Sequence, residues 1–158
     1  MAKFGNKSKE ILATVHQDLQ TVLEYAIKIV DFTILRGACT AEEQFQLYKQ
    51  GRKKVGDAWV IANKKKVVTY KDGHIMKSRH QYKEAIDIAF YRKTIPHIIW
   101  DDDKANYYLV GIVLGVAEML RQYGAIDCTI RSGANWDCDE ELDDETFYDV
   151  FHIERNLP

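Results

Sequence analysis

Two amphipathic helices constrain this fold more than any other feature of the sequence. Over residues 11–30, apolar side chains recur at spacings of three and four, the period of one helix face. Ser8 is the expected N-cap of this helix. Residues 103–123 repeat the pattern, and Gly124 is placed to end it. Each apolar stripe has to be buried, so we expect both helices to pack on one core.

The segments between these helices predict strands and one further helix. Short apolar or β-branched runs indicate strands at residues 32–35, 85–90, 126–131 and 147–154. Thr40 opens a capping-box sequence, Thr-Ala-Glu-Glu, which predicts a helix ending near Gly51. The sequence therefore predicts one α+β domain over residues 1–158, with helices packed on a small antiparallel sheet.

Residues 52–77 are polar and basic, and here we expect a surface loop. Within it, residues 67–70 and 74–76 flank a Lys-Asp-Gly turn, which predicts a hairpin.

The composition excludes several classes of protein. The net charge of −2 gives no reason to expect nucleic acid or an anionic membrane as a partner. Lys and Arg concentrate in residues 52–83 and acidic residues in 137–149, and either block can simply solvate a face. Three cysteines without paired spacing argue against a disulfide framework. The charged N-terminus predicts no signal peptide, and no apolar run is long enough to insert in a membrane.

Two stretches carry groups suited to metal chemistry: residues 78–87, Ser-Arg-His-Gln-Tyr-Lys-Glu-Ala-Ile-Asp, and residues 148–154, Tyr-Asp-Val-Phe-His-Ile-Glu. They supply two imidazoles and a carboxylate, in His80, His152 and Asp87. A catalytic zinc site uses three such ligands and leaves a fourth position for water. Histidines also stand near aspartates by chance, so spacing alone leaves purely structural roles open.

A second carboxylate, Asp149, stands three residues before His152 and is a candidate general base. In a straight strand, a spacing of three puts two side chains on opposite faces. For both to serve one site, Asp149 has to lie on a turn or bulge.

The chain carries Ser-x-His, then Ala-x-Asp after four further residues, and acid-x-x-His far downstream. This order of motifs resembles the zinc D-Ala-D-Ala carboxypeptidase family. That family includes vancomycin-resistance dipeptidases and phage L-alanyl-D-glutamate endolysins. Further segments resemble the endolysin branch, among them Phe4-Gly5, residues 12–15, residues 31–34 and Gly-Ala-Asn-Trp at 133–136. The resemblance implies zinc held by His80, Asp87 and His152, Asp149 as catalytic base, and the small α+β fold shared with the zinc domain of Hedgehog proteins.

Three departures from the family pattern matter. Lys83 stands where the motif usually has Gly, and Asp149 where many members have the longer Glu. Cys39 stands where relatives commonly place an Arg that is thought to polarise the scissile carbonyl. The candidates to replace that charge are Arg36, Lys77 and Arg79.

Other residues have two open interpretations. Ser78 and Glu154 are candidates to hydrogen-bond the ligand histidines, although Glu154 can equally be a surface residue. Trp136 can line the substrate cleft or lie in the core. The acidic run with Asp137, Asp139, Glu141, Asp143 and Asp144 can bind Ca²⁺ or form a solvated loop, but it lacks the EF-hand pattern.

The resemblance implies a zinc metallopeptidase that hydrolyses the L-Ala-D-Glu amide of the peptidoglycan stem peptide during host cell lysis. We expect a monomer made in the host cytoplasm that acts on the wall in the periplasm. Two alternatives remain: a D-Ala-D-Ala carboxypeptidase or dipeptidase of the same family, and a non-catalytic, Hedgehog-like zinc-binding module.

Overall fold

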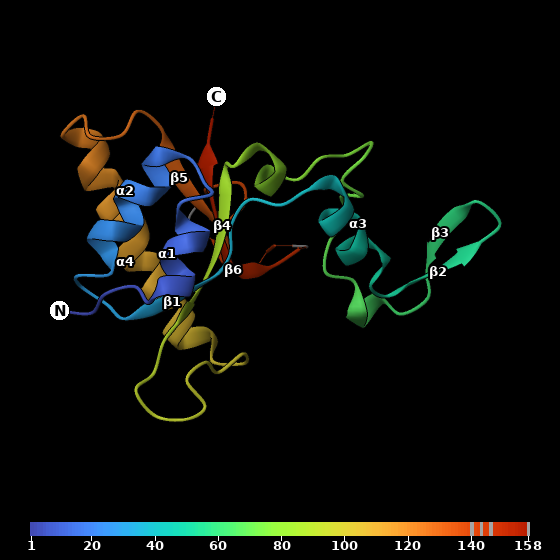
Figure 1. Cartoon of the computed structure of the whole chain (residues 1–158), viewed down its shortest axis with the longest axis horizontal. Coiled ribbons are helices and arrows are strands. Elements are labelled where there is room, and N and C mark those ends of the chain that lie inside the picture. The colour runs from blue at the N-terminus through green and yellow to red at the C-terminus, as the bar shows by residue number, and fades with distance from the viewer. Residues whose placement is uncertain (140, 143, 146, 158) are drawn as a thin grey trace.

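A four-stranded sheet stands at the centre of the computed structural model, which describes residues 1–158 except 140, 143, 146 and 158 (Figure 1). The strand order is β1–β4–β6–β5, and all neighbours are antiparallel. The strands are β1 (Phe32–Arg36), β4 (Ala85–Phe90), β5 (Thr129–Gly133) and β6 (Asp149–Asn156). The predicted α+β class with a small antiparallel sheet is confirmed.

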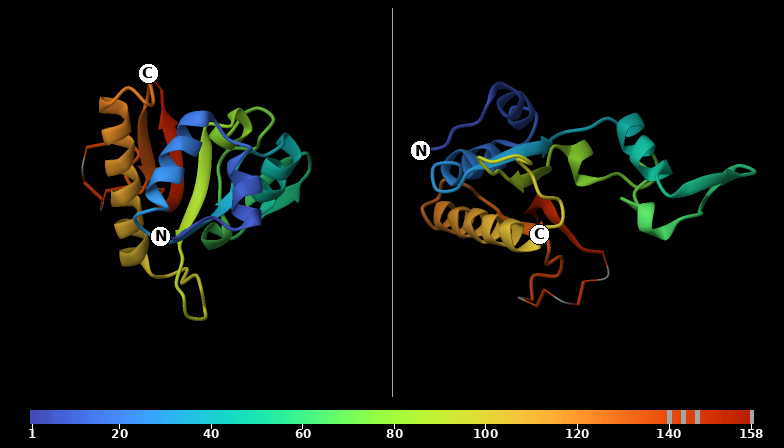
Figure 2. Two further views of the ribbon diagram at one scale, coloured as in Figure 1. Left: turned by 60° about the vertical axis from the view of Figure 1, so that its left-hand side comes forward. Right: turned by 90° about the horizontal axis from the view of Figure 1, so that it is seen from below.

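Helices cover one side of this sheet (Figures 1 and 2). The helix α4 (Asp103–Gln122) packs on β4, β5 and β6, and α2 (Gln17–Ala26) packs on α4. The short α1 (Asn6–Leu12) packs on β1, while α3 (Ala41–Lys49) stands apart, beyond the other side of the sheet. No helix in the described part of the chain is long and apolar enough to cross a membrane.

Alternation along β4 separates the core from the polar side of the sheet. Ile86 and Ile88 are buried in the main hydrophobic cluster, so Asp87 between them faces the other way. The small residues Ala85 and Ala89 share its face, as the sequence predicts. The helices therefore fill one side of the sheet and leave the other for a site.

The predicted helix over residues 11–30 is wrong as one continuous element, because it is divided into α1 and α2. Thr14 Oγ1 donates to Ile11 O and accepts from Ala38 N, and His16 caps α2 by accepting from Asp18 N. These side chains satisfy backbone groups at a break between helices. The N-cap of α1 is Gly5; Ser8 lies inside α1, and its Oγ accepts from Ile34 N.

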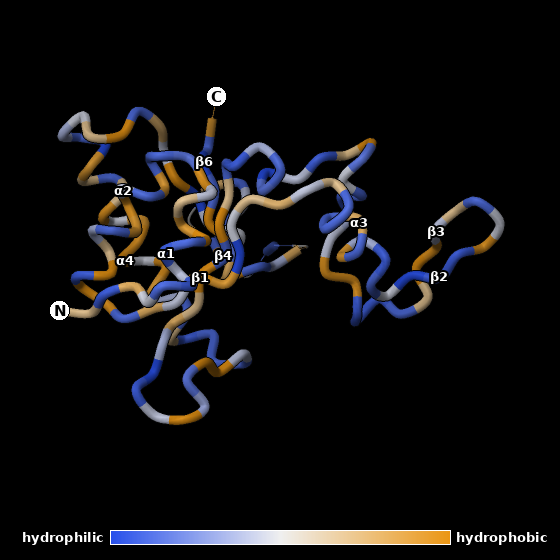
Figure 3. The backbone as a smooth tube through the Cα atoms, in the orientation of Figure 1, coloured by the Kyte–Doolittle hydropathy of each residue, from blue (hydrophilic) through white to orange (hydrophobic). Residues whose placement is uncertain are grey.

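The predicted hairpin of residues 67–76 is also wrong. The hairpin lies earlier, as β2 (Arg52–Val55) and β3 (Ala58–Ile61), joined at Gly56-Asp57. In the segment predicted as the second strand, Asp72 Oδ1 instead accepts from the backbone N–H groups of residues 74–76. β2 contains three cationic residues and appears largely blue in Figure 3, so its hydropathy gave no strand signal. Two 3-10 helices follow, η1 (Lys64–Lys66) and η2 (Arg79–Tyr82).

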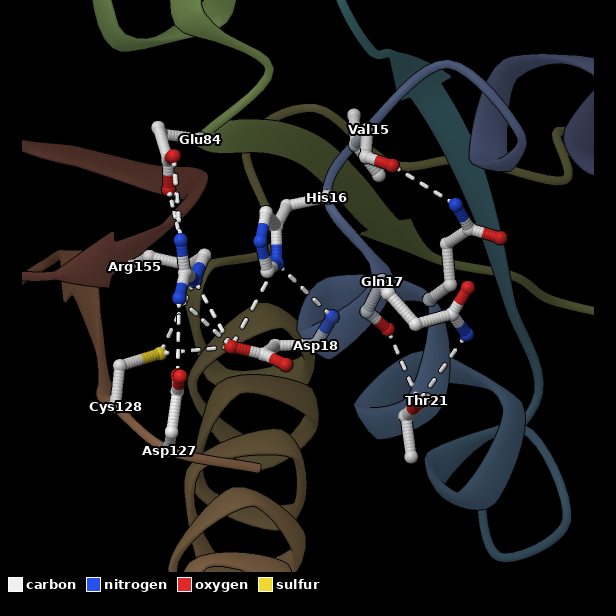
Figure 4. A network of polar contacts seen from close by, with 10 residues as sticks. Val15, His16, Gln17, Asp18, Thr21, Glu84, Asp127, Cys128 and Arg155 are labelled. Atoms are coloured by element: carbon white, nitrogen blue, oxygen red, sulfur yellow. Dashed lines mark hydrogen bonds and ion pairs between the residues drawn. The ribbon is translucent and has the colours of Figure 1, made fainter. Parts of the chain in front are cut away.

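A buried arginine ties together the ends of the strands that carry the candidate site (Figure 4). Arg155 of β6 donates to both carboxylate oxygens of Glu84, at 3.2 and 2.9 Å, just before β4. It also donates to Asp18 of α2 at 3.0 Å and to Asp127 at 3.1 Å. Arg155 therefore joins β4, β6, α2 and the segment before β5 through charge-assisted hydrogen bonds.

Candidate metal centre

Three groups from separate elements converge on the polar side of the sheet. His80 comes from η2, and Asp87 of β4 lies directly opposite His152 of β6 in the strand register. Asp87 Oδ1 is 3.2 Å from His80 Nε2 and 3.1 Å from His152 Nδ1, and the two nitrogens are 3.3 Å apart. Zinc ligands at the usual bond lengths and tetrahedral angles lie about 3.3 Å apart. The triangle therefore fits three corners of a zinc tetrahedron.

The outer nitrogen of each histidine has a fixed acceptor. His80 Nδ1 lies 2.8 Å from Gly37 O, and His152 Nε2 lies 3.0 Å from Glu154 Oε2. When these nitrogens donate, His80 Nε2 and His152 Nδ1 carry free lone pairs that point at the centre of the triangle. The three groups can therefore hold a cation once His152 Nδ1 is deprotonated.

Glu154 is held as a carboxylate although its side chain is only 4% exposed. Burial acts to raise its pKa, but hydrogen bonds from His152 and Arg131 outweigh that effect and lower the pKa to about 2. Arg131 donates to Glu154 Oε1 through Nε at 2.9 Å and through its terminal nitrogen at 2.6 Å. Arg79 Nε lies 3.8 Å from the same oxygen. Glu154 therefore stays ionised and orients the His152 ring.

Asp149 is the first residue of β6. The strand is irregular between Asp149 and His152, where their spacing of three residues requires a bulge if both are to face one site. Ser132 pairs with Ile153, but the next residue, Gly133, pairs with Asp149. Residues 150–152 are thus extra on β6, a bulge that changes which side chains share a face. Asp149 and His152 line the same pocket. Burial, and then repulsion by Asp87, raises the pKa of Asp149, as suits a group that accepts and returns a proton.

The candidate ligands and Asp149 open into a pocket of about 680 Å³ between the sheet, α3 and residues 68–71. Its aromatic lining includes Trp136, Tyr70 and Phe147. The Trp136 ring lies 5.2 Å from that of His152, and the rings of Tyr70 and Phe147 meet edge to face at 5.6 Å. Trp136 therefore lies in the cleft, which is one of its two predicted positions.

Of the three candidate replacements for the family arginine, two line this pocket. Arg36, at the end of β1, donates to Gln44 Oε1 at 2.9 Å, and Arg79 lies beside Glu154. Lys77 is not among the lining residues, and its ammonium lies 5.7 Å from the centre of the Tyr82 ring. The structure thus brings Arg36 and Arg79 to the site and leaves Lys77 outside it.

Reasoning from sequence missed two polar side chains of the site, Arg131 and Gln44, as well as the acceptor Gly37 O and the aromatic lining of Tyr70 and Phe147. Arg131 holds Glu154, and Gln44, which is 1% exposed, positions Arg36 while donating to Thr69 Oγ1 and Lys71 O. The alternation of β5 could have indicated Arg131, but only once its pairing with Glu154 was known. Gln44 follows the capping box directly and carried no separate signal.

The structure also bears on the predictions for Lys83 and Ser78. Lys83 adopts a left-handed conformation, with φ of 62°, so the backbone keeps the turn that a glycine would favour. Ser78 does not bond His80, whose partner is Gly37 O. It lines the pocket instead, and its buried Oγ has no hydrogen-bond partner among the described residues. Ser78 thus keeps only its predicted role toward substrate.

The acidic run brings together Asp137, Asp139 and Asp144, whose carboxylates lie within 4.8 Å of one another. All three are exposed. Glu141 is exposed as well, and Asp143 lies outside the described residues. Exposed acidic clusters are common without an ion, so Ca²⁺ binding here stays a prediction.

The chain matches known proteins along nearly its whole length. Residues 1–155 match the family model of the phage L-alanyl-D-glutamate peptidase. The L-alanyl-D-glutamate peptidase of Escherichia phage T5 is 29% identical over 158 positions, covering 96% of each chain. The peptidoglycan L-alanyl-D-glutamate endopeptidase CwlK of Bacillus subtilis is 41% identical over 76 residues, 48% of this chain and 38% of that protein.

A solved structure supports the fold. The L-Ala D-Glu endopeptidase ChiX of Serratia marcescens superimposes with a TM-score of 0.63 at 19% identity, over 97% of this chain and 89% of that one. At 19% sequence identity, this structural similarity supports the fold only. The family match spans nearly the whole chain, including both stretches that supply the triangle, and the chain therefore belongs to the phage L-alanyl-D-glutamate peptidase family.

Proposed function

We propose that this chain is a zinc-dependent peptidoglycan endopeptidase that hydrolyses the L-Ala-D-Glu amide of the stem peptide. The observation that carries the proposal is the triangle of His80, Asp87 and His152, which opens into a pocket that also holds Asp149. Two relatives named for this bond, one of them from a phage, support the choice of substrate. In this proposal, residues 1–158 act as one catalytic domain.

Zinc fits the triangle better than a hard cation does. Two imidazoles and one carboxylate suit zinc, whereas Ca²⁺ and Mg²⁺ prefer an all-oxygen shell. His80, Asp87 and His152 would hold the zinc ion, which would supply Lewis acidity and lower the pKa of water at the site to about 7.

Asp149 is the group that moves protons in this proposal. Its carboxylate takes a proton from the attacking water and returns it to the nitrogen of the leaving D-Glu. A raised pKa helps the second step, because Asp149 then holds the proton long enough to deliver it. Glu154 and Arg131 keep His152 in place throughout and take no proton.

The pocket cations suit the charge of the substrate. Arg36 reaches the pocket with a neutral partner, the Gln44 amide, so its charge is available to a carbonyl oxygen or a carboxylate of the stem peptide. The hydroxyl of Ser78 lies in the same lining and is available to donate. We propose both as substrate contacts, and Arg36 as the replacement for the missing family arginine.

The phage family suggests a setting for the reaction. We propose synthesis in the host cytoplasm, action on the wall during lysis, and a monomeric active form. Calcium binding by the acidic run is a separate proposal, and isothermal titration that shows no binding at millimolar Ca²⁺ would refute it.

One digestion tests the proposed bond. Zinc-loaded protein is incubated with Gram-negative peptidoglycan, with and without a chelator, and the new amino termini are identified by mass spectrometry. New D-Glu amines that the chelator abolishes support the proposal. Release of D-Ala would point to a carboxypeptidase, and absence of any cleavage would point to a non-catalytic zinc module.

A further inference from the structure

The β2–β3 hairpin is a cationic projection beside the pocket. It extends beyond α3, away from the sheet, in Figure 1 and in the right-hand view of Figure 2. Residues 49–66, which we call the basic arm, contain seven lysines and arginines and one acidic residue, Asp57. The chain as a whole has a net charge of −2, so this local charge is strongly asymmetric.

The basic arm is anchored to α3 by one face of the hairpin. The Arg52 guanidinium lies 3.9 Å from the centre of the Tyr48 ring, and Trp59 meets Phe45 edge to face at 6.1 Å. At its base, Gly51 O accepts from the backbone N–H groups of Ala62 and Asn63, at 2.8 and 2.9 Å. These contacts hold the arm in a defined position.

The opposite face has no partner within the described chain. The register places Lys53, Val55, Ala58 and Val60 there, opposite the face of Arg52 and Trp59. Val55 is 53% exposed and Val60 39%. Lys54 and the three lysines of η1 are exposed as well. The arm therefore presents ammonium groups next to small aliphatic side chains.

The base of the arm continues into the pocket that holds the metal centre. Gln50 at the end of α3 lines the pocket, and so do Val68 and Lys71 just after η1. A polymer lying along the arm would thus lead directly to the pocket.

We propose that the basic arm is a binding surface for the anionic peptide-bearing strands of peptidoglycan, which it holds while one stem peptide occupies the pocket. This inference rests on the proposed function. The chemistry is complementary, because stem peptides carry free carboxylates spaced among alanine methyl groups. Charge attraction of this kind raises the local concentration of substrate and weakens with salt.

The test compares two triple variants with the same change in charge. The arm variant carries Lys53→Glu, Lys54→Glu and Lys65→Glu; the control carries Lys3→Glu, Lys7→Glu and Lys9→Glu, all exposed and outside the arm. Binding to intact sacculi is measured by co-sedimentation with Asp149→Asn added to every protein, so that turnover does not destroy the ligand. Hydrolysis of a short soluble stem peptide is measured with the same variants carrying the native Asp149.

We expect the arm variant to bind sacculi about tenfold or more weakly than the control, and to cleave the soluble peptide with a kcat/KM within twofold of it. The inference would be overturned if the two variants bound sacculi equally. It would also be overturned if the arm variant lost soluble-peptide cleavage to the same extent as it lost binding. Arm-dependent binding of the native protein to anionic phospholipid vesicles, as tight as to sacculi, would assign the arm to a membrane instead. Failure of the native protein to cleave the soluble peptide would refute the proposed function, whatever the binding result.

Discussion

Replacing Glu154 by glutamine should weaken zinc binding without dismantling the fold. Glu154 is nearly buried, accepts from His152 at 3.0 Å and receives two hydrogen bonds from Arg131. Glu154→Gln keeps the shape but removes the charge that satisfies both partners. The amide can accept from only one side, so either His152 or Arg131 loses its acceptor. Loss of such an outer partner typically lowers metal affinity about 10- to 100-fold, or about 1.4–2.7 kcal/mol.

Glu84→Gln is the matched control, because Glu84 also pairs with an arginine, Arg155, but touches none of the candidate metal ligands. Both variants should lose stability in thermal unfolding, and only Glu154→Gln should lose zinc in competition with a chromophoric chelator. The reasoning is refuted if Glu154→Gln binds zinc within twofold of the native protein, or if Glu84→Gln weakens binding equally.

Three further predictions concern protonation, the buried arginine and the turn at Lys83. Burial acts to lower the pKa of His152, but Asp87 and Glu154 outweigh it and raise the pKa to about 9 in the metal-free protein. Zinc must then displace a proton from His152 at pH 7, so the affinity for zinc should rise as the pH increases towards 9. Calorimetry in two buffers should report the released proton. A zinc affinity that does not depend on pH would contradict this prediction. The protonated His152 stabilises the metal-free protein fully below its unfolded pKa of about 6.5, and this stabilisation should fade as the pH rises through 9. Arg155→Met should cost about 3–5 kcal/mol in urea unfolding, because it leaves the buried Asp18 and the partly buried Glu84 without their cation. A loss under about 1 kcal/mol would show that Arg155 does not hold these elements together. Lys83→Gly should raise the free energy of unfolding by about 1 kcal/mol, since it relieves a left-handed lysine, and a decrease would show that the turn is not strained.

The sequence predicted that His80, Asp87 and His152 come together, and it predicted this better than the segments around them. The positions of His80, Asp87 and His152 follow a motif whose spacing is read along the chain, and strand alternation gave the correct face for Asp87. The pairing of Arg131 with Glu154 depends on the register between β5 and β6, which no local pattern specifies.

The two wrong secondary-structure predictions have local physical causes. The apolar stripe of residues 11–30 is real, and the core buries it through both α1 and α2. Periodicity could not register the break, because Thr14 and His16 act there through side-chain hydrogen bonds. The β2–β3 hairpin was missed because its first strand is mostly lysine and arginine. The hairpin is also stabilised by packing on α3, a tertiary contact that no local sequence pattern indicates.

Asp149 carries the proton, in the mechanism proposed here, at a zinc site formed by His80, Asp87 and His152. Zinc content and peptidoglycan turnover of Asp149→Asn separate these two roles. We expect zinc to stay bound at one ion per chain while turnover falls by about 10²- to 10⁴-fold, the usual contribution of general acid–base catalysis. A variant that keeps both its zinc and its full activity would show that Asp149 is not the base.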